Sequence, residues 1–324
     1  MSLFDRRVAF KPYEYPDLLY YKDAIRHSYW LHTEFNVSSD IQDFKVNVSP
    51  AERSVIKKTM MAISQIEISV KTFWAKIYDR MPKPEIGAVG MTFAESEIRH
   101  ADAYAFLLEK LGLNDEFEKI HEIPAMIDRI NYLQKHISGS RSRDDKTYAL
   151  SVLLFSVFIE HVSLFSQFLI MMSFNKHKGM FKGISNIVEA TSKEEDIHGM
   201  FGIEIVKILK KEKPEWFDDE MEKAIIKACV KAETAEKKVL DWIFEDGELD
   251  FLPKDVVVNF IRDRFNSSLE SLGIAPQFEV DTDMLDLTEW FDDEALVSKD
   301  NDNFNKRSTS YSKKSKSVTS KDLF

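Results

Sequence analysis

The sequence predicts an all-α protein built as a bundle of long helices. Helical periodicity runs through most of the chain, and no convincing strand alternation interrupts it. The 324 residues include only 10 glycines and 9 prolines. All-β folds and dinucleotide-binding α/β folds use glycine freely at turns and phosphate loops, whereas long helices pack as bundles with little of it.

Local signals place the helices in order along the chain. Ser49 is a suitable N-cap, Pro50 suits the first helical position and Glu52 can close a capping box. Proline, glycine and a Ser/Gly/Arg stretch at 138–143 end or separate the following segments, with a break expected near Pro124. The expected helices are 50–80, 85–111, 116–136, 145–174, 181–211, 218–244 and 254–272.

The flanking segments differ from this central region in composition. Residues 1–35 are expected to form an arm and a short helix, and residues 36–299 to form the bundle. From about residue 299 the chain is rich in Ser, Lys, Asn and Thr. Residues 300–324 are therefore expected to be a flexible tail.

Charge and cysteine content exclude several classes of protein. The chain has 44 Lys and Arg against 55 Asp and Glu, a net charge of −11, which argues against nucleic-acid binding. Cys229 is the single cysteine, so no internal disulfide or cysteine-based metal cluster can form. The apolar stretch 149–174 could span a bilayer, but Glu160 and His161 lie in its middle. We expect a buried helix there, no signal peptide and a cytoplasmic protein without membrane contact.

Three Glu-x-x-His pairs are present, a spacing that puts two potential metal ligands on one helix face. They are Glu97/His100, Glu118/His121 and Glu195/His198. With eight histidines, about one such pair is expected by chance. Glu118/His121 stands in a highly charged segment before Pro124 and is interpreted as a solvated surface pair.

Each of the other two pairs follows a helix with a carboxylate in an apolar setting. Glu67 precedes the first pair and Glu160 precedes the second. A lone buried carboxylate is costly unless a metal or another cation compensates it. Four carboxylates and two imidazoles from four helices are the ligand set of ferritin-like dinuclear proteins, and they suit Fe(II) or Mn(II). The alternative is a set of buried ion pairs or surface residues.

A resemblance to a known family adds to this interpretation. The segment from Glu97 to Tyr104 resembles the second-helix motif of the radical-generating small subunit of class I ribonucleotide reductases. Trp30 with residues 34–40 is similar to that family's N-terminal tryptophan segment, and Glu195–His198 to its fourth-helix motif. Residues 303–311 are similar to its redox-active tail.

The resemblance implies roles for individual residues. Glu67, Glu97 and His100 would hold one metal, and Glu160, Glu195 and His198 the other. Tyr104 would be oxidised by the metals, and Trp30 and Tyr311 would carry the oxidising equivalent to a catalytic subunit bound through the tail. A homodimer is also implied. The terminal Leu323 and Phe324 could fill a pocket on that partner.

Three residues differ from, or stand out within, the family pattern. Glu67 stands where the family usually has Asp, and Glu194 stands where an Asp usually links the tryptophan to the metal-bound histidine. Because of this second difference, the sequence does not decide whether a hydrogen-bonded carboxylate links Trp30 to the histidine. Lys71 follows Glu67 by four residues and could attract an anionic oxidant such as superoxide. Glu67 and Lys71 together favour a dimanganese cofactor, with diiron as the alternative.

Two other functions remain open at this point. A ferritin-like ferroxidase or storage protein could use the same ligands, but it would not need Trp30, Tyr104 or an aromatic tail. A stand-alone dinuclear oxidase would need an open substrate pocket. The favoured function is a subunit that stores an oxidising equivalent for the reduction of ribonucleotides by a cysteine-bearing partner.

Overall fold

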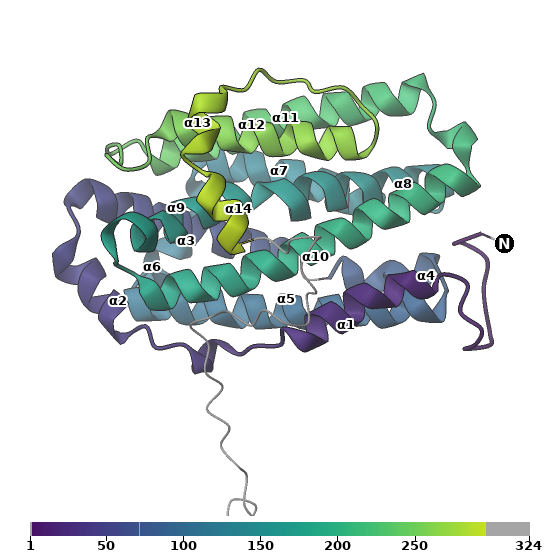
Figure 1. Cartoon of the computed structure of the whole chain (residues 1–324), viewed down its shortest axis with the longest axis horizontal. Coiled ribbons are helices and arrows are strands. Elements are labelled where there is room, and N and C mark those ends of the chain that lie inside the picture. The colour runs from purple at the N-terminus through teal and green to yellow at the C-terminus, as the bar shows by residue number, and fades with distance from the viewer. Residues whose placement is uncertain (1, 71, 296–324) are drawn as a thin grey trace, which may run out of the picture.

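The structure is a computed structural model that describes residues 2–70 and 72–295, and it is dominated by helices (Figure 1). Within these residues there is no β-strand, only an isolated bridge between Leu249 and Leu252. The all-α prediction is therefore confirmed. The longer helices are α3 (Pro50–Val70), α5 (Pro84–Leu111), α7 (Pro124–Gly139), α8 (Asp145–Leu154), α9 (Phe165–Lys178), α10 (Lys182–Glu212), α11 (Asp219–Ile243) and α12 (Lys254–Ser271).

The long helices pack side by side in layers. Helix α5 contacts α3 and α10; α5 and α10 form the lower layer in Figure 1, and α3 lies above them at mid-height beside α9. Helices α11 and α12 contact each other and form the upper layer, where α11 packs on α7. The apolar side chains that these helices bury form one continuous core. Charged ligands at its centre are consequently far from bulk solvent.

The N-terminal segment wraps the lower layer. It contains η1 (Pro16–Leu18), α1 (Leu19–His27), η2 (His32–Glu34), α2 (Ser38–Gln42) and η3 (Asp43–Asn47). Helix α1 packs on α5 and α10. Asp40 of α2 is fully buried and accepts a hydrogen bond of 2.6 Å from the backbone nitrogen of Ile184, in the first turn of α10. The arm is thereby fixed to the helix that carries Glu195.

The helix expected over 50–80 is wrong as a single element. Helix α3 ends at Val70, and the chain then forms η4 (Trp74–Lys76) and α4 (Ile77–Arg80). Phe73 and Trp74 are buried against Phe155, so tertiary packing of two aromatic rings overrides the local helical pattern. Gly90 of α5 permits this path, because a Cβ there would lie 2.6 Å from the carbonyl oxygen of Trp74.

The apolar helix expected over 145–174 is also divided. Between α8 and α9 lies η6 (Phe155–Ser163), a π-helical segment that carries Glu160. Helix α10 approaches this segment closely at Gly202, where a Cβ would lie 1.9 Å from Ser156 Oγ. The stretch Asp145–Lys178 is long and apolar enough to cross a membrane, but 89% of its most apolar window is buried inside the protein. This stretch therefore lies in the core of the bundle, as expected from its sequence.

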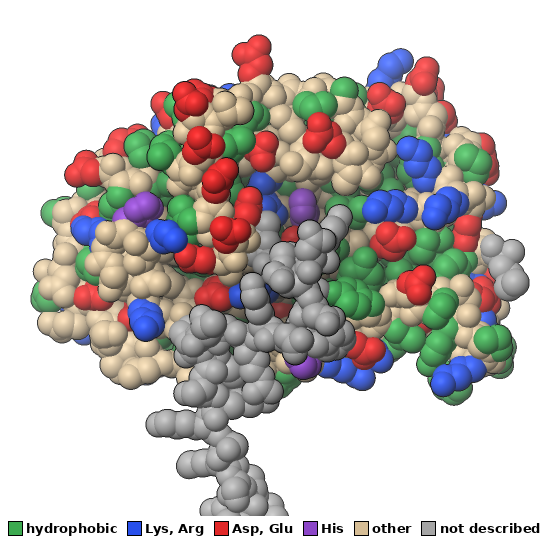
Figure 2. All heavy atoms as spheres, in the orientation of Figure 1, with side chains coloured by type: hydrophobic (Ala, Val, Ile, Leu, Met, Phe, Trp, Pro, Cys, Tyr) green, Lys and Arg blue, Asp and Glu red, His purple; other side chains and the backbone are tan. Residues whose placement is uncertain are grey.

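Smaller elements complete the described chain. The segment expected as a helix over 116–136 is divided into α6 (Asn114–Phe117), η5 (Ile120–Glu122) and α7, with the expected break at Pro124. After α10 come η7 (Pro214–Trp216) and, beyond α12, α13 (Thr282–Asp286) and α14 (Glu289–Ala295). Acidic side chains gather over α13 and α14 on the face shown in Figure 2. A surface of this charge would repel nucleic acid.

Candidate metal centre

Six side chains from four elements meet in the core. They share nearly complete burial, with at most 1% of each residue exposed. They are Glu67 of α3, Glu97 and His100 of α5, Glu160 of η6, and Glu195 and His198 of α10. The six residues singled out from the sequence as metal ligands therefore lie together in space.

The six residues form two overlapping groups. Glu67 and His100 complete one group with Glu97 and Glu195, and Glu160 and His198 complete the other with the same two glutamates. In each group, one ligand atom per residue lies within 4.8 Å of the others. The resemblance assigned Glu97 and Glu195 to different metals, and in the structure each of them belongs to both groups.

Both imidazoles present Nδ1 to the carboxylates. His100 Nδ1 lies 2.8 Å from a Glu195 oxygen. His198 Nδ1 lies 3.2 Å from both Glu97 and Glu195, and 3.5 Å from Glu160. The Nε2 atoms point away from the cluster and are held by other side chains. Each imidazole is thus oriented as a ligand whose outer nitrogen fixes its ring.

The carboxylates lack sufficient protein partners. Both oxygens of Glu67 and of Glu97, and one of Glu195, are buried without a hydrogen bond from the described residues. Burial, followed by neighbouring carboxylate charge, raises the pKa of Glu97 and Glu160. Unpaired buried oxygens of this kind need cations. An oxygen-rich set with one imidazole per position fits two ions of Fe(II) or Mn(II).

The outer nitrogen of His100 leads into a charged network. His100 Nε2 lies 2.8 Å from an oxygen of Glu194, whose carboxylate also accepts two hydrogen bonds from Arg99. Trp30 stacks on His100, with ring centroids 5.9 Å apart and planes inclined by 17°. The sequence left open whether Glu194 links Trp30 to the histidine. In the structure Glu194 does contact His100. The buried Nε1 of Trp30, however, has no hydrogen-bond partner among the described residues.

The outer nitrogen of His198 faces a different environment. Its Nε2 lies 2.9 Å from the hydroxyl oxygen of Ser96, and the ring of Phe93 lies 4.2 Å from the imidazole. Trp74 donates a hydrogen bond of 3.0 Å from Nε1 to Glu160. Sequence reasoning missed Ser96, Trp74 and also Arg99. Arg99 offered a signal, since a charged residue lies directly between two expected ligands.

Tyr104 occupies the next turn of α5 after His100 and is 1% exposed. Burial, and then the negative charge of Glu67, raise the pKa of this phenol well above its ordinary value. The nearby Thr191 hydroxyl offsets part of this rise in the pKa. Tyr104 is therefore a neutral, water-shielded phenol beside the cluster.

The remaining candidates lie apart from the cluster or outside the described residues. Glu118 and His121 are exposed and belong to neither group. Lys71, Tyr311, Leu323 and Phe324 fall outside the described residues.

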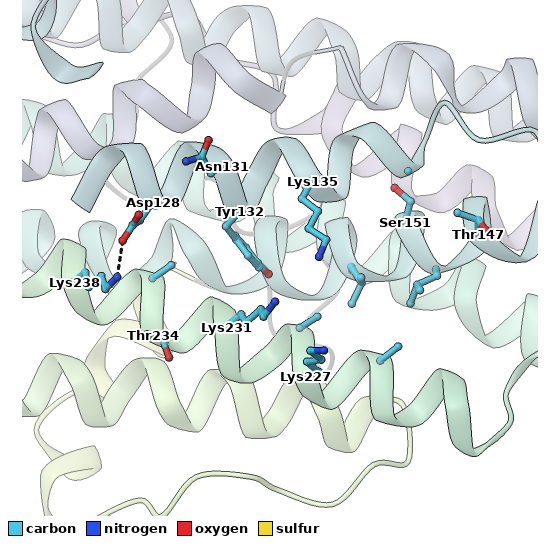
Figure 3. Close-up of a pocket in the computed structure, with 16 residues that line it drawn as sticks. Asp128, Asn131, Tyr132, Lys135, Thr147, Ser151, Lys227, Lys231, Thr234 and Lys238 are labelled. Atoms are coloured by element: carbon cyan, nitrogen blue, oxygen red, sulfur yellow. Dashed lines mark hydrogen bonds and ion pairs between the residues drawn. The ribbon is translucent and has the colours of Figure 1, made fainter. Parts of the chain in front are cut away.

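A cleft of about 600 Å³ opens elsewhere, between α7, α8 and α11 (Figure 3). Tyr132 and apolar residues line it together with Lys135, Lys227, Lys231 and Lys238. Lys238 is paired with Asp128. None of the six cluster residues lines this cleft, so it is a separate feature of the surface.

Comparisons with known proteins agree with this geometry. Residues 7–284 match the sequence model of the family described as ribonucleotide reductase, small chain. A probable ribonucleoside-diphosphate reductase small subunit of Invertebrate iridescent virus 3 is 25% identical, over 97% of this chain and 87% of the relative.

Two solved structures share the fold. A putative class I ribonucleotide reductase from Bacillus halodurans has a TM-score of 0.76 at 17% identity, covering 86% of this chain and 98% of its own. Dimanganese(II) NrdF from Streptococcus sanguinis has a TM-score of 0.70 at 15% identity, covering 87% and 96%. The helical fold of this chain is thus one that solved proteins also adopt.

Proposed function

This chain belongs to the ribonucleotide reductase small chain family, and we propose that its six clustered residues hold the two metal ions on which activity depends. It is the radical-generating small subunit, and a separate catalytic subunit reduces ribonucleotides to deoxyribonucleotides. One observation carries the ligand assignment: Glu97 and Glu195 belong to both groups of buried ligand atoms. Two carboxylates shared in this way could each supply a ligand atom to either ion.

When bound, the ions supply the oxidising equivalent that the catalytic subunit uses. The chain's own residues provide four helical elements that hold the ligand atoms in place. They also exclude water, since the six residues are at most 1% exposed. Water exclusion protects a strong oxidant from side reactions during storage.

We assign Tyr104, His100 and Trp30 to the path of the oxidising equivalent. Tyr104 lies one helical turn beyond His100 and keeps its proton in the resting protein, because burial raises the pKa of the phenol. Trp30 stacks on the outer face of His100 and follows Tyr29, which is 41% exposed. The proposed path therefore leads from the cluster through His100 and Trp30 to a residue that is partly exposed to solvent.

Manganese is the proposed metal, and iron is the alternative. Glu67 in the first ligand position supports this choice, and the fold of this chain is shared with a dimanganese protein. The test is metal analysis and EPR spectroscopy of protein loaded separately with Mn(II) and Fe(II), followed by turnover with the catalytic subunit. Turnover of the iron form alone would reject manganese. If Lys71 attracts superoxide, K71M should slow activation by that oxidant, and high salt should slow it in the unmodified protein.

The tail is proposed to join this subunit to its catalytic partner. Deleting Leu323 and Phe324 should weaken association, because two apolar side chains would leave a pocket on the partner, and metal content should not change. Y311F should preserve association and abolish turnover, since phenylalanine lacks the oxidisable phenol. Full activity of Y311F would reject the role of the tail in radical transfer.

The storage and stand-alone oxidase functions are not favoured by the family match. Either of them would keep its activity after removal of residues 300–324, whereas the proposed subunit would lose turnover. We also propose a homodimer in the cytoplasm, which sedimentation of the purified chain and cell fractionation would test.

A further inference from the structure

Arg99 is an unusual residue to find at the core of this site. It lies on α5 between Glu97 and His100 and is only 4% exposed. Its guanidinium donates to both oxygens of Glu194, at 3.1 and 3.0 Å. A bidentate arginine–carboxylate contact of this kind fixes the orientation of the carboxylate as well as its distance from the guanidinium.

Further contacts hold the guanidinium itself in place. Arg99 Nε donates to Glu95 at 2.9 Å, and Nη1 reaches the backbone oxygen of Trp30 at 3.3 Å. The guanidinium carbon lies 4.6 Å from the centroid of the Tyr29 ring and 5.6 Å from that of Trp30. Arg99 therefore ties the N-terminal arm to the outside of the cluster.

Glu194 is fully engaged by these contacts. One oxygen accepts from Arg99 and the other is shared between Arg99 and His100 Nε2, which lies 2.8 Å away. Trp30 Nε1 is buried but has no hydrogen-bond partner among the described residues. A buried indole N–H normally finds an acceptor, so the lack of one for Trp30, whose ring stacks on His100, requires an explanation.

We infer that Arg99 is a positioning residue that holds Glu194 on His100 and keeps it from the indole N–H of Trp30. Trp30 is then coupled to His100 through ring stacking and not through a carboxylate hydrogen bond. The meaning of this coupling for radical transfer rests on the proposed function. The hydrogen-bond arrangement itself does not, and it can be measured without turnover.

The experiment uses the full-length protein without metal, labelled with ¹⁵N at the tryptophan indoles. W30F identifies the Trp30 signal in a transverse-relaxation-optimised spectrum. In the unmodified protein, the Trp30 indole proton should resonate in the upfield range of indoles without a hydrogen bond. In R99M, Glu194 is free to turn toward Trp30, and this signal should shift downfield.

R262M is the matched control, because Arg262 donates to Glu233 at 2.8 Å in another part of the structure. It should leave the Trp30 signal in place. R99K should shift the signal as R99M does, since a lysine ammonium cannot replace the bidentate contact. A loosened Glu194 should also lower the affinity of R99M for Mn(II) about 10- to 100-fold, as loss of an outer hydrogen-bond partner does.

Either of two results would overturn the inference. One is a hydrogen-bonded position of the Trp30 signal in the unmodified protein, a measurement that needs no variant to fold. The other is an unshifted signal in folded R99M and R99K. Failure of the proposed function would look different, because W30F would then retain full turnover while the shifts remained as described.

Discussion

The two sides of the metal centre differ in what surrounds each histidine. On the His100 side, the outer nitrogen meets Glu194 and Arg99, and Trp30 stacks against the ring. On the His198 side, the outer nitrogen lies 2.9 Å from the hydroxyl oxygen of Ser96, next to the ring of Phe93, and no charged partner is found for it among the described residues. Each histidine turns Nδ1 toward three carboxylates of the cluster, but the groups that hold the outer nitrogens differ.

This difference suits the two sides to different tasks. One side holds a metal ion in place, and the other also offers a path for the oxidising equivalent to the surface. The His198 side is enclosed by aromatic rings, since Trp74, Phe93 and Phe201 are all fully buried and contact one another. The His100 side connects a charged network to an arm that reaches solvent at Tyr29. A stored oxidising equivalent should leave through the side that meets the arm.

The largest expected effect concerns what the two sides share. E195A should remove both metals, because Glu195 belongs to both groups, whereas E160A should remove the ion on the His198 side alone. Elemental analysis of the purified variants measures this directly. E118A is the control, since Glu118 is exposed and should leave metal content unchanged. Retention of both ions in E195A would show that Glu195 is not a ligand common to the two sides.

The second effect separates the two tryptophans. W30F should abolish turnover with the catalytic subunit, because phenylalanine is much harder to oxidise than tryptophan and cannot carry the oxidising equivalent. Metal content should stay normal. W74F removes one hydrogen bond to Glu160, worth about 1 kcal/mol, and should reduce metal affinity only several-fold. Equal loss of turnover in both variants would mean that the two sides do not differ as conductors.

The third effect concerns Tyr104. Y104F should retain both metals, because the phenol oxygen is not among the six ligands, and it should lose any tyrosyl signal in the EPR spectrum of activated protein. A tyrosyl signal that persists in Y104F would place the radical on another residue.

The smallest effect compares the two outer supports. E194A should weaken Mn(II) binding about 10- to 100-fold, because it leaves the buried His100 and Arg99 without their shared partner. S96A removes a neutral hydrogen bond of about 1 kcal/mol and should weaken binding less than tenfold. Titration of metal-free protein followed by EPR gives both constants. The reverse order would assign the stronger support to His198.

Sequence reasoning found most of the helical segments and the two Glu-x-x-His pairs of the cluster, because both depend on short spacing. Glu97 and His100 lie three apart, so any α-helix puts them on one face. It could not predict that Glu97 and Glu195 belong to both groups of ligand atoms, because this depends on how closely the four elements pack against one another. That approach depends on Gly202 against Ser156 and on the π-helical turn at Glu160, and neither has a clear local signal.

The break after α3 was missed for a similar reason. Residues 50–80 have good helical periodicity, but burial of Phe73 and Trp74 against Phe155 decides the path. Trp74 then reaches Glu160 from a segment that no spacing rule connects to it. The outer supports of the histidines are tertiary features, whereas the ligands themselves are largely features of single helices.

The π-helical segment η6 has a consequence for the direction in which Glu160 points. A π-helix holds an extra residue in its turn and is less favourable than an α-helix. If 155–163 formed an ordinary α-helix with no residue removed, Glu160 would turn by about one residue step, about 100°, around the helix axis relative to α8. Deleting one residue from 155–159 removes the extra residue together with the wide turn, so Glu160 would keep close to its present direction. The extra residue thus sets the direction of Glu160, and a variant that loses the π-turn without losing a residue should fold but fail to assemble its cofactor.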